Sequence, residues 1–312
     1  MIKRTLYFGN PAILSLKNNQ LILKFPEVER YPEVKRLVKE PTEFSYHIPD
    51  LGILILDHPQ ITITHALISE LIKNNVVIIS CNESHHPRGL MLTLHSNTLQ
   101  SERYQSQISA SEPLKKQLWM QIVKQKIINQ AKVLKNNNPK ANHEFLLKLV
   151  KDVKSGDSTN REAVAASFYW SNLFVNEPFF VRSREGDPPN NLLNYVYSII
   201  RACVARSIVE AGLLPTLGIH HHSRYNPYCL ADDLMEPYRP YGDDIVYKIT
   251  SSKKDYSELN KEIKQELLRV LYIDCKISGE VSPLQIACLR TARSLFQCFE
   301  GKLRKLQLPE LD

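Results

Sequence analysis

Glycine is scarce in this sequence, with 10 glycines among 312 residues, whereas about 7% is usual in soluble proteins. Neither GxGxxG nor GxxxxGKS/T occurs, and both of these motifs use glycine-rich backbone to cradle phosphates. The scarcity argues against a nucleotide-dependent enzyme of the common kinds.

Long apolar runs and targeting signals are also missing. No apolar run in the sequence approaches the ~18 residues that a membrane span needs. The N-terminal MIKRTLYFGNPA has no apolar core of the kind a signal peptide uses. The six cysteines are spread without a CxxC pair, a pattern typical of reduced, mostly buried thiols rather than of a disulfide framework or a zinc site. We therefore expect a cytoplasmic protein with no membrane partner.

Positive charge is concentrated in one segment of the chain. The net charge is +7, and residues 103–154 hold eleven Lys/Arg against three acids, so this segment carries the whole excess. Such a field attracts polyanions, most commonly nucleic-acid phosphate. The alternative interpretation is a solvated lysine-rich helix face that keeps the protein soluble.

Two domains follow from the change in hydrophobic periodicity. Residues 1–95 are β-rich, with short β-branched runs punctuated by Asn and Pro and one helix over residues 65–74. Residues 96–312 have helical spacing almost throughout and form the predicted all-α domain. Helices are predicted at 118–134, 145–150, 160–174, 190–211, 258–272 and 283–306. Ser158 and Thr159 can cap the third of these, and Gly212 suits the left-handed cap after the fourth. The fold class is α+β with two domains.

Three features of the helical half carry possible chemistry, and the first is Glu162. It lies in the first turn of a predicted helix between small alanines, where its carboxylate could approach a metal or phosphate site. The alternative is that the helix dipole favours an acid there, without any functional role.

The second feature is a run of three histidines, His220 to His222, in the loop after Gly218. Imidazole is a good ligand for Mn²⁺, Zn²⁺ and similar ions. Adjacent side chains point in different directions, so at most one or two of these histidines can serve one ion. The alternative is a solvated polar loop.

The third feature is the segment Leu230–Pro240, LADDLMEPYRP, where Asp233 and Glu236 share one face of a helical turn. Two carboxylates after a histidine loop suggest a site for a hard divalent cation, and Arg239 could hold a phosphate or orient a carboxylate. The alternative is a capped helix with a structural Arg–carboxylate pair. Together with the basic segment, these features favour Mg²⁺- or Mn²⁺-assisted phosphodiester chemistry on DNA or RNA.

These residues resemble a known family, the CRISPR-associated integrase/endonuclease of spacer acquisition, and in particular the subfamily that accompanies a single large RNA-guided effector nuclease. The resemblance runs through most of the helical domain. It rests on NLLNY (191–195), AGLLP (211–215), LGIHH (217–221), LADDLMEPYRP (230–240), WMQIVKQKI (119–127) and NQA (129–131).

The resemblance implies a metal triad of Glu162, His221 and Glu236. Asp233 is a nearby helper and Arg239 a possible phosphate contact. A shift of one position in the alignment would make His220 the ligand in place of His221. The implied cofactor is Mg²⁺ or Mn²⁺.

The resemblance also implies an N-terminal β-sandwich that dimerises and a helical catalytic domain. Expected partners are a second copy of the chain, the small companion adaptation protein, double-stranded DNA (spacer precursor and CRISPR repeat) and the RNA-guided effector nuclease. The implied reaction inserts a short duplex into the CRISPR array, as the 3′-hydroxyl of the incoming DNA attacks a repeat phosphodiester.

The basic segment would then follow the phosphate backbone of the incoming duplex. Aromatic side chains near the motif could stack on an unpaired base, although Trp170 is better explained as helix core. The residues predicted to contact DNA are Arg161, Lys115, Lys116, Lys124, Lys126, Lys132, Tyr169 and Tyr225. Two alternatives stay open: a DNA-binding scaffold without catalysis, and a metal-dependent hydrolase of small phosphate esters.

Overall fold

The structure is a computed structural model that describes residues 2–26, 43–94, 97–177, 180–183, 185–252 and 255–312. The chain divides into two compact units, Met1–Ser96 and Asn97–Asp312. The first is rich in strands and the second is mainly helical, as the sequence predicts.

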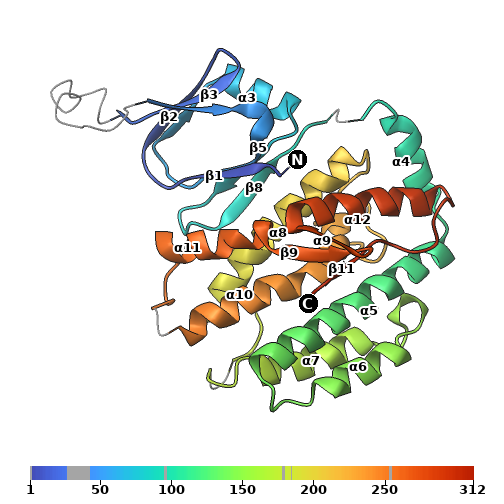
Figure 1. Ribbon diagram of the computed structural model, residues 1–312. Helices are drawn as coiled ribbons and strands as arrows, with labels where there is room; N and C mark the ends of the chain where they lie inside the picture. Colours follow the sequence, from blue (N-terminus) through green and yellow to red (C-terminus); the bar gives the residue numbers. More distant parts are fainter. Residues whose placement is uncertain (1, 27–42, 95–96, 178–179, 184, 253–254) are drawn as a thin grey trace. The chain divides into compact units, whose positions relative to one another are not determined.

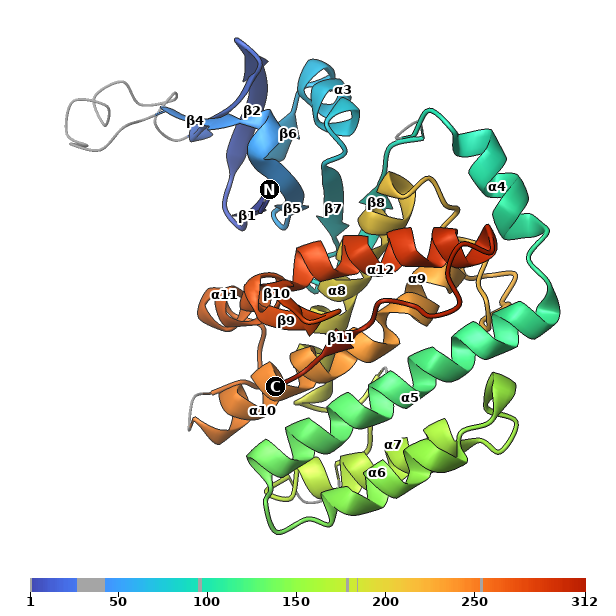
Figure 2. The ribbon, with the colours of Figure 1, turned by 45° about the vertical axis from the view of Figure 1, so that its right-hand side comes forward.

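The N-terminal unit contains two four-stranded mixed sheets (Figures 1 and 2). In the first, β1, β5 and β7 run parallel and β8 joins β7 antiparallel. In the second, β4, β3 and β2 are antiparallel, and β6 runs parallel to β2. The bounds of the first sheet are β1 (Arg4–Phe8), β5 (Leu51–Leu56), β7 (Val77–Cys81) and β8 (Pro87–Met91). Those of the second are β4 (Glu43–His47), β3 (Gln20–Lys24), β2 (Ala12–Lys17) and β6 (Ile61–Ile63).

One apolar core lies among these strands and the helix α3 (His65–Lys73). Leu14 of β2, Leu54 of β5 and Leu67 of α3 are all fully buried in it. The helix begins at Thr64, whose hydroxyl accepts a hydrogen bond from the Leu67 amide. The strand β8 overlaps a polar stretch of the sequence, residues 80–89, which has no apolar alternation.

The C-terminal unit is built from helices that follow most of the predicted segments. The helices α6 and α7 pack along the long helix α5 in both ribbon views (Figures 1 and 2). Their bounds are α4 (Gln100–Ile108), α5 (Glu112–Asn137), α6 (His143–Asp152), α7 (Arg161–Leu173), α8 (Asn190–Glu210), α9 (Cys229–Met235), α10 (Arg239–Ser251), α11 (Lys261–Leu268) and α12 (Leu284–Phe299). Short 3-10 segments are η1 (Ile48–Asp50), η2 (Ser155–Asp157), η3 (Glu236–Tyr238) and η4 (Arg269–Tyr272).

The prediction of an all-α second domain is wrong in one respect. A small antiparallel sheet joins β9 (Asp274–Ile277) to β10 (Glu280–Pro283) and to β11 (Pro309–Glu310). The β9–β10 turn is Ser278-Gly279, with φ of 51° and 82°, the two positive values that a two-residue hairpin requires. The strands of this sheet lie almost entirely between and after the predicted helices 258–272 and 283–306. The observed helices are shorter than those predicted: α11 starts at Lys261 and α12 ends at Phe299.

The helix α8 is the central element of this unit. Within the described part of the chain it alone is long and apolar enough to cross a membrane, yet 83% of its apolar window is buried inside the protein. The helix is followed by Ala211 at the cap position and then by Gly212, whose φ of +74° suits the left-handed conformation predicted for it. This burial identifies α8 as a core helix.

A buried amide fastens α5 to two other segments. The Asn129 side chain donates hydrogen bonds to Pro237 O at 2.8 Å and to Pro309 O at 3.0 Å. Its carbonyl oxygen accepts from the Leu311 amide at 3.2 Å. This side chain therefore fixes α5 beside η3 and β11, one turn from Lys126.

Candidate functional site

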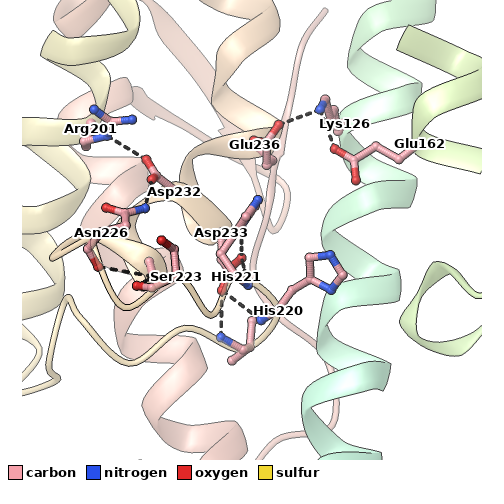
Figure 3. Close-up of polar contacts among 12 residues, drawn as sticks. Lys126, Glu162, Arg201, His220, His221, Ser223, Asn226, Asp232, Asp233 and Glu236 are labelled. Carbon is pink, nitrogen blue, oxygen red and sulfur yellow. Dashed lines mark hydrogen bonds and ion pairs between the residues drawn. The ribbon is translucent and has the colours of Figure 1, made fainter. Parts of the chain in front are cut away.

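Three elements bring two carboxylates and one ammonium together. Lys126 of α5 lies between Glu162, in the first turn of α7, and Glu236, at the start of η3 (Figure 3). Its Nζ is 2.6 Å from Glu162 Oε1 and 2.6 Å from Glu236 Oε2. The second carboxylate oxygen of Glu236 faces Arg239 Nε at 2.9 Å. The two carboxylates therefore converge on one cation.

The charges in this cluster stabilise one another despite their burial. Glu236 is only 4% exposed, and burial alone would raise its pKa, but Arg239 and Lys126 hold that pKa below its ordinary value. Burial would lower the pKa of Lys126, but Glu236 and Glu162 raise it above its ordinary value. Both shifts favour the charged forms of Glu236 and Lys126.

The first turn of α7 is held by an aspartate. Asp157 accepts hydrogen bonds from the amides of Arg161 and Glu162, both at 2.9 Å. The prediction that Ser158 and Thr159 cap this helix is wrong. Asn160, at the cap position with a left-handed φ of 51°, makes no side-chain cap, and Asp157 reaches over the turn instead. The capping acid orients the backbone that carries Glu162.

Asp233 organises the histidine loop. Its carboxylate accepts hydrogen bonds from the backbone amides of Ile219, His220 and His221 at 2.7 to 3.1 Å. The same carboxylate is 2.6 Å from Nδ1 of the His221 ring. Gly218 permits this close approach, because a Cβ there would lie 2.4 Å from His221 O and 2.8 Å from Asp233 Oδ2. The loop is built around one buried carboxylate.

The two candidate histidines lie in different environments. The His220 ring stacks on Trp119, with centroids 4.1 Å apart and ring planes 3° apart, and burial lowers its pKa. The hydrogen bond that the His221 ring donates to Asp233 raises the pKa of His221. In a neutral His221, the Nδ1–H donates to Asp233 and leaves Nε2 with the lone pair that binds a metal. This contrast favours His221 over His220 as a ligand.

Two carboxylates and an imidazole are a donor set that suits a divalent cation such as Mg²⁺ or Mn²⁺. Glu162 and Glu236 already point at a common cation, and Glu236 Oε2 is buried in a contact with Lys126 that lacks hydrogen-bond geometry. In the described ranges no three His, Cys, Asp or Glu side chains are close enough to enclose an ion as they stand. The Lys126 ammonium lies between the carboxylates of Glu162 and Glu236.

Arg239 belongs to a second buried layer. Its guanidinium lies over the Tyr197 ring at 4.7 Å from the centroid, and the Tyr197 hydroxyl donates to Asp243. Tyr169 donates to the other oxygen of Asp243 at 3.1 Å. Burial raises the pKa of Asp243 to about 7. Tyr197, itself hydrogen-bonded to Asp243, thus packs against the guanidinium of Arg239, which pairs with Glu236.

The residues predicted to contact DNA separate into exposed and buried groups. Lys116 is exposed, and the Tyr225 side chain is 80% exposed with Arg224 over its ring. Lys126 and Tyr169 belong to the same set of predicted DNA contacts, but both point into the protein. The Lys126 ammonium contacts two carboxylates, and the fully buried Tyr169 side chain donates a hydrogen bond to Asp243. Neither buried side chain is available to a duplex. The half-buried members are Arg161, Lys115, Lys124 and Lys132.

A pocket of about 670 Å³ opens beside the histidine loop. His221, Lys115, Arg224 and Tyr225 are among its lining residues, together with apolar Phe299. Cationic and aromatic groups therefore lie next to the proposed metal ligand. Such a lining suits a nucleotide, because its phosphate attracts cations and its base stacks on aromatic rings.

Sequence reasoning missed the roles of several residues. Lys126 was counted among surface lysines, because nothing in the sequence distinguishes a buried ammonium from a solvated one. Asp157, Trp119 and Asp243 were not singled out. The i, i+3 spacing placed Asp233 and Glu236 on one face, but Asp233 contacts the histidine loop and Glu236 contacts Lys126.

Known proteins share both sequence and fold with this chain. The family described as CRISPR associated protein Cas1 matches residues 11–268. The chain is 33% identical over 313 residues to the CRISPR-associated endonuclease Cas1 of Neisseria meningitidis serogroup C (strain 8013), which covers 100% of this chain and 97% of the relative.

Solved structures with the same fold are more distant in sequence. A casposase bound to an integration product has a TM-score of 0.79 at 22% identity, covering 98% of this chain and 92% of that one. A chain of a Cas6-RT-Cas1--Cas2 complex has a TM-score of 0.75 at 19% identity, covering 99% of this chain and 36% of the larger one.

Proposed function

The chain belongs to the CRISPR-associated Cas1 family, and we propose that it is a metal-dependent DNA endonuclease and integrase of CRISPR adaptation. It inserts a short duplex into the CRISPR array. The 3′-hydroxyl of the incoming strand loses its proton to solvent as its oxygen attacks a phosphorus of the repeat, a new P–O bond forms, and the old P–O bond breaks. The released 3′-oxygen takes up a proton, so the step is a transesterification that needs no nucleotide cofactor.

The observation that carries this proposal is the convergence of Glu162 and Glu236 on one cation beside His221. Glu162, Glu236 and His221 would hold Mg²⁺ or Mn²⁺, which when bound polarises the scissile phosphate and stabilises charge on the oxygens. Asp233 fixes the ring of His221, and Arg239 keeps Glu236 ionised in its buried position. A carboxylate behind a ligating histidine is the usual support of such sites.

The DNA would lie along the basic segment. Exposed Lys116, half-buried Lys124 and Lys132, and Lys115 in the pocket wall supply cations for the phosphate backbone. Tyr225 offers an exposed ring at the same pocket for an unpaired base. These positions support duplex binding that depends on charge and shape more than on base sequence.

The partners follow from the family. The N-terminal unit would be a β-sandwich-like module that joins two copies of the chain. A solved Cas6-RT-Cas1--Cas2 complex shares this fold, which supports a small companion adaptation protein as a further partner. The RNA-guided effector nuclease is the remaining candidate.

The test uses a labelled branched duplex that mimics a half-integrated product, with the full chain in Mn²⁺, in Mg²⁺ and in chelator. Strand rejoining is expected with either metal and is expected to vanish in chelator, in Glu162→Gln and in Glu236→Gln. Glu144→Gln, on an exposed position of α6, is the matched control. Binding of the duplex without strand transfer in any metal would favour a non-catalytic scaffold instead.

A further inference from the structure

The space between the two site carboxylates is filled by a group of the protein itself. Lys126 is only 12% exposed, and its Nζ is 2.6 Å from each of Glu162 and Glu236. Glu236 keeps Arg239 on its other oxygen. The ammonium thus touches one oxygen of each carboxylate that the proposed function assigns to a divalent cation.

We propose that the Lys126 ammonium is a built-in occupant of the divalent-cation position, which an incoming Mg²⁺ or Mn²⁺ must displace. The inference rests on the proposed function for the identity of the cation site. It adds a residue that controls access of the cation to that site.

Without a cation between them, the carboxylates of Glu162 and Glu236 would be unstable in this arrangement. Two carboxylates that face each other, one of them buried, repel and lack solvation. Lys126 neutralises that pair, so Glu162 and Glu236 stay aimed at one point before any metal arrives. The site is therefore preorganised by an internal cation.

Displacement follows from the same electrostatics. A divalent ion that bound the two oxygens now in contact with Nζ would lie within a few ångströms of the ammonium, and like charges at that distance repel strongly. Lysine can leave because its charge sits on a flexible four-carbon stem with rotatable donors. Arg239 lies on the opposite oxygen of Glu236 and can remain. Metal binding thus exchanges one cation for another at some cost in affinity.

Mn²⁺ binding to the full chain without DNA tests the proposal, with free Mn²⁺ followed by electron paramagnetic resonance. Lys126→Met is expected to bind Mn²⁺ about tenfold more tightly than wild type, because it removes the competing charge. Lys135→Met removes a charge from an exposed position of the same helix and is expected to leave the affinity unchanged. Thermal unfolding is expected to show Lys126→Met less stable than wild type in chelator, and Mn²⁺ to raise its Tm by more than it raises that of wild type.

Lys126→Gln is the second variant in case methionine prevents folding. It removes the charge but keeps an amide donor, so the same gain in Mn²⁺ affinity is expected. If folded Lys126 variants bind Mn²⁺ equally or more weakly than wild type, the displacement inference is overturned while the metal site stands. If no folded variant, and no wild type, binds Mn²⁺, the proposed metal site itself fails.

Discussion

The carboxylate of Asp233 holds His221 at two points, its backbone amide at 3.1 Å and its ring Nδ1 at 2.6 Å. One buried side chain thereby fixes both the path of the loop and the orientation of the imidazole. The arrangement leaves Nε2 as the ring nitrogen for a metal. The orientation of the His221 ring therefore depends on the Asp233 carboxylate as well as on the loop backbone.

Asp233→Asn is expected to weaken Mn²⁺ binding and strand transfer by about 10- to 100-fold, the usual cost of losing a carboxylate behind a ligating histidine. The amide nitrogen of asparagine cannot accept the bonds that the second carboxylate oxygen accepts. Mn²⁺ titration and the branched-duplex assay measure the effect. Asp152→Asn, at an exposed position, is the control, and an unchanged Mn²⁺ affinity in Asp233→Asn would contradict the assignment.

The two histidines are separable by mutation. His221→Ala is expected to abolish metal-dependent strand transfer, because a proposed ligand is lost. His220→Ala is expected to retain Mn²⁺ affinity within about threefold and to lower the stability, because the stack on Trp119 is lost. Mn²⁺ titration and urea unfolding of both variants show which histidine binds the metal and which one stabilises the fold. The reverse pattern would identify His220 as the ligand.

Gly218→Ala is expected to cost about 1–3 kcal/mol of stability, since the added methyl would overlap His221 O and Asp233 Oδ2 and must push the loop away. Strand transfer is expected to fall with it, because His221 moves. Gly89→Ala is the matched control, as no described atom other than its chain neighbours would meet the new methyl there. Urea unfolding compares the two, and equal stabilities would show that the loop yields freely.

The stability of the protein is expected to carry a pH dependence from Asp243. Burial raises its pKa to about 7 in the folded state, whereas the unfolded chain releases this proton near pH 4. Between these values the folded state binds more protons, so this residue makes stability fall as pH rises, by up to about 1.4 kcal/mol per pH unit. Above pH 7 its contribution is constant.

Asp243→Asn is expected to remove this slope between about pH 5 and pH 7. Urea unfolding at several pH values measures the difference between wild type and variant, in which the other titrating groups cancel. Asp244→Asn, the next residue along α10, controls for a general effect of lost charge. Parallel curves for wild type and Asp243→Asn would show that Asp243 titrates in its ordinary range.

Lys116→Ala is expected to weaken duplex binding and to reduce the salt slope of log K by about 1, because one phosphate contact is lost. Lys116 is exposed on α5, and its removal is not expected to alter Mn²⁺ affinity. Fluorescence anisotropy over a range of salt concentrations measures the slope. An unchanged slope would place the duplex elsewhere on the surface.

The sequence predicted the main elements because apolar periodicity marks them. The long helix around Leu118–Leu134 was found in this way, since its buried positions recur at helical spacing. The core helix α8 is buried nearly all round and was recognisable from its long apolar stretch before Gly212. The β9–β11 sheet escaped because its strands have four residues or fewer. The Ser278-Gly279 turn was the available signal for it.

The candidate site was predictable as a set of residue types but not as a geometry. The resemblance pointed to Glu162, His221 and Glu236, and spacing drew attention to Asp233. Nothing in the sequence says that Lys126 turns inward, because its partners lie 36 and 110 positions further along the chain. Contacts of that range depend on tertiary packing, which local patterns do not encode.

The buried carboxamide of Asn129 also links the site to a segment of the chain that is synthesised late. Its oxygen accepts from Gln125 as well as from Leu311, and its nitrogen donates to Pro237 and to Pro309. Pro309 and Leu311 are translated after Lys126 and Glu236. Until then the amide has unmet hydrogen bonds whose burial is costly. The contact between α5 and η3 is therefore expected to reach its full stability only after Pro309 has been synthesised.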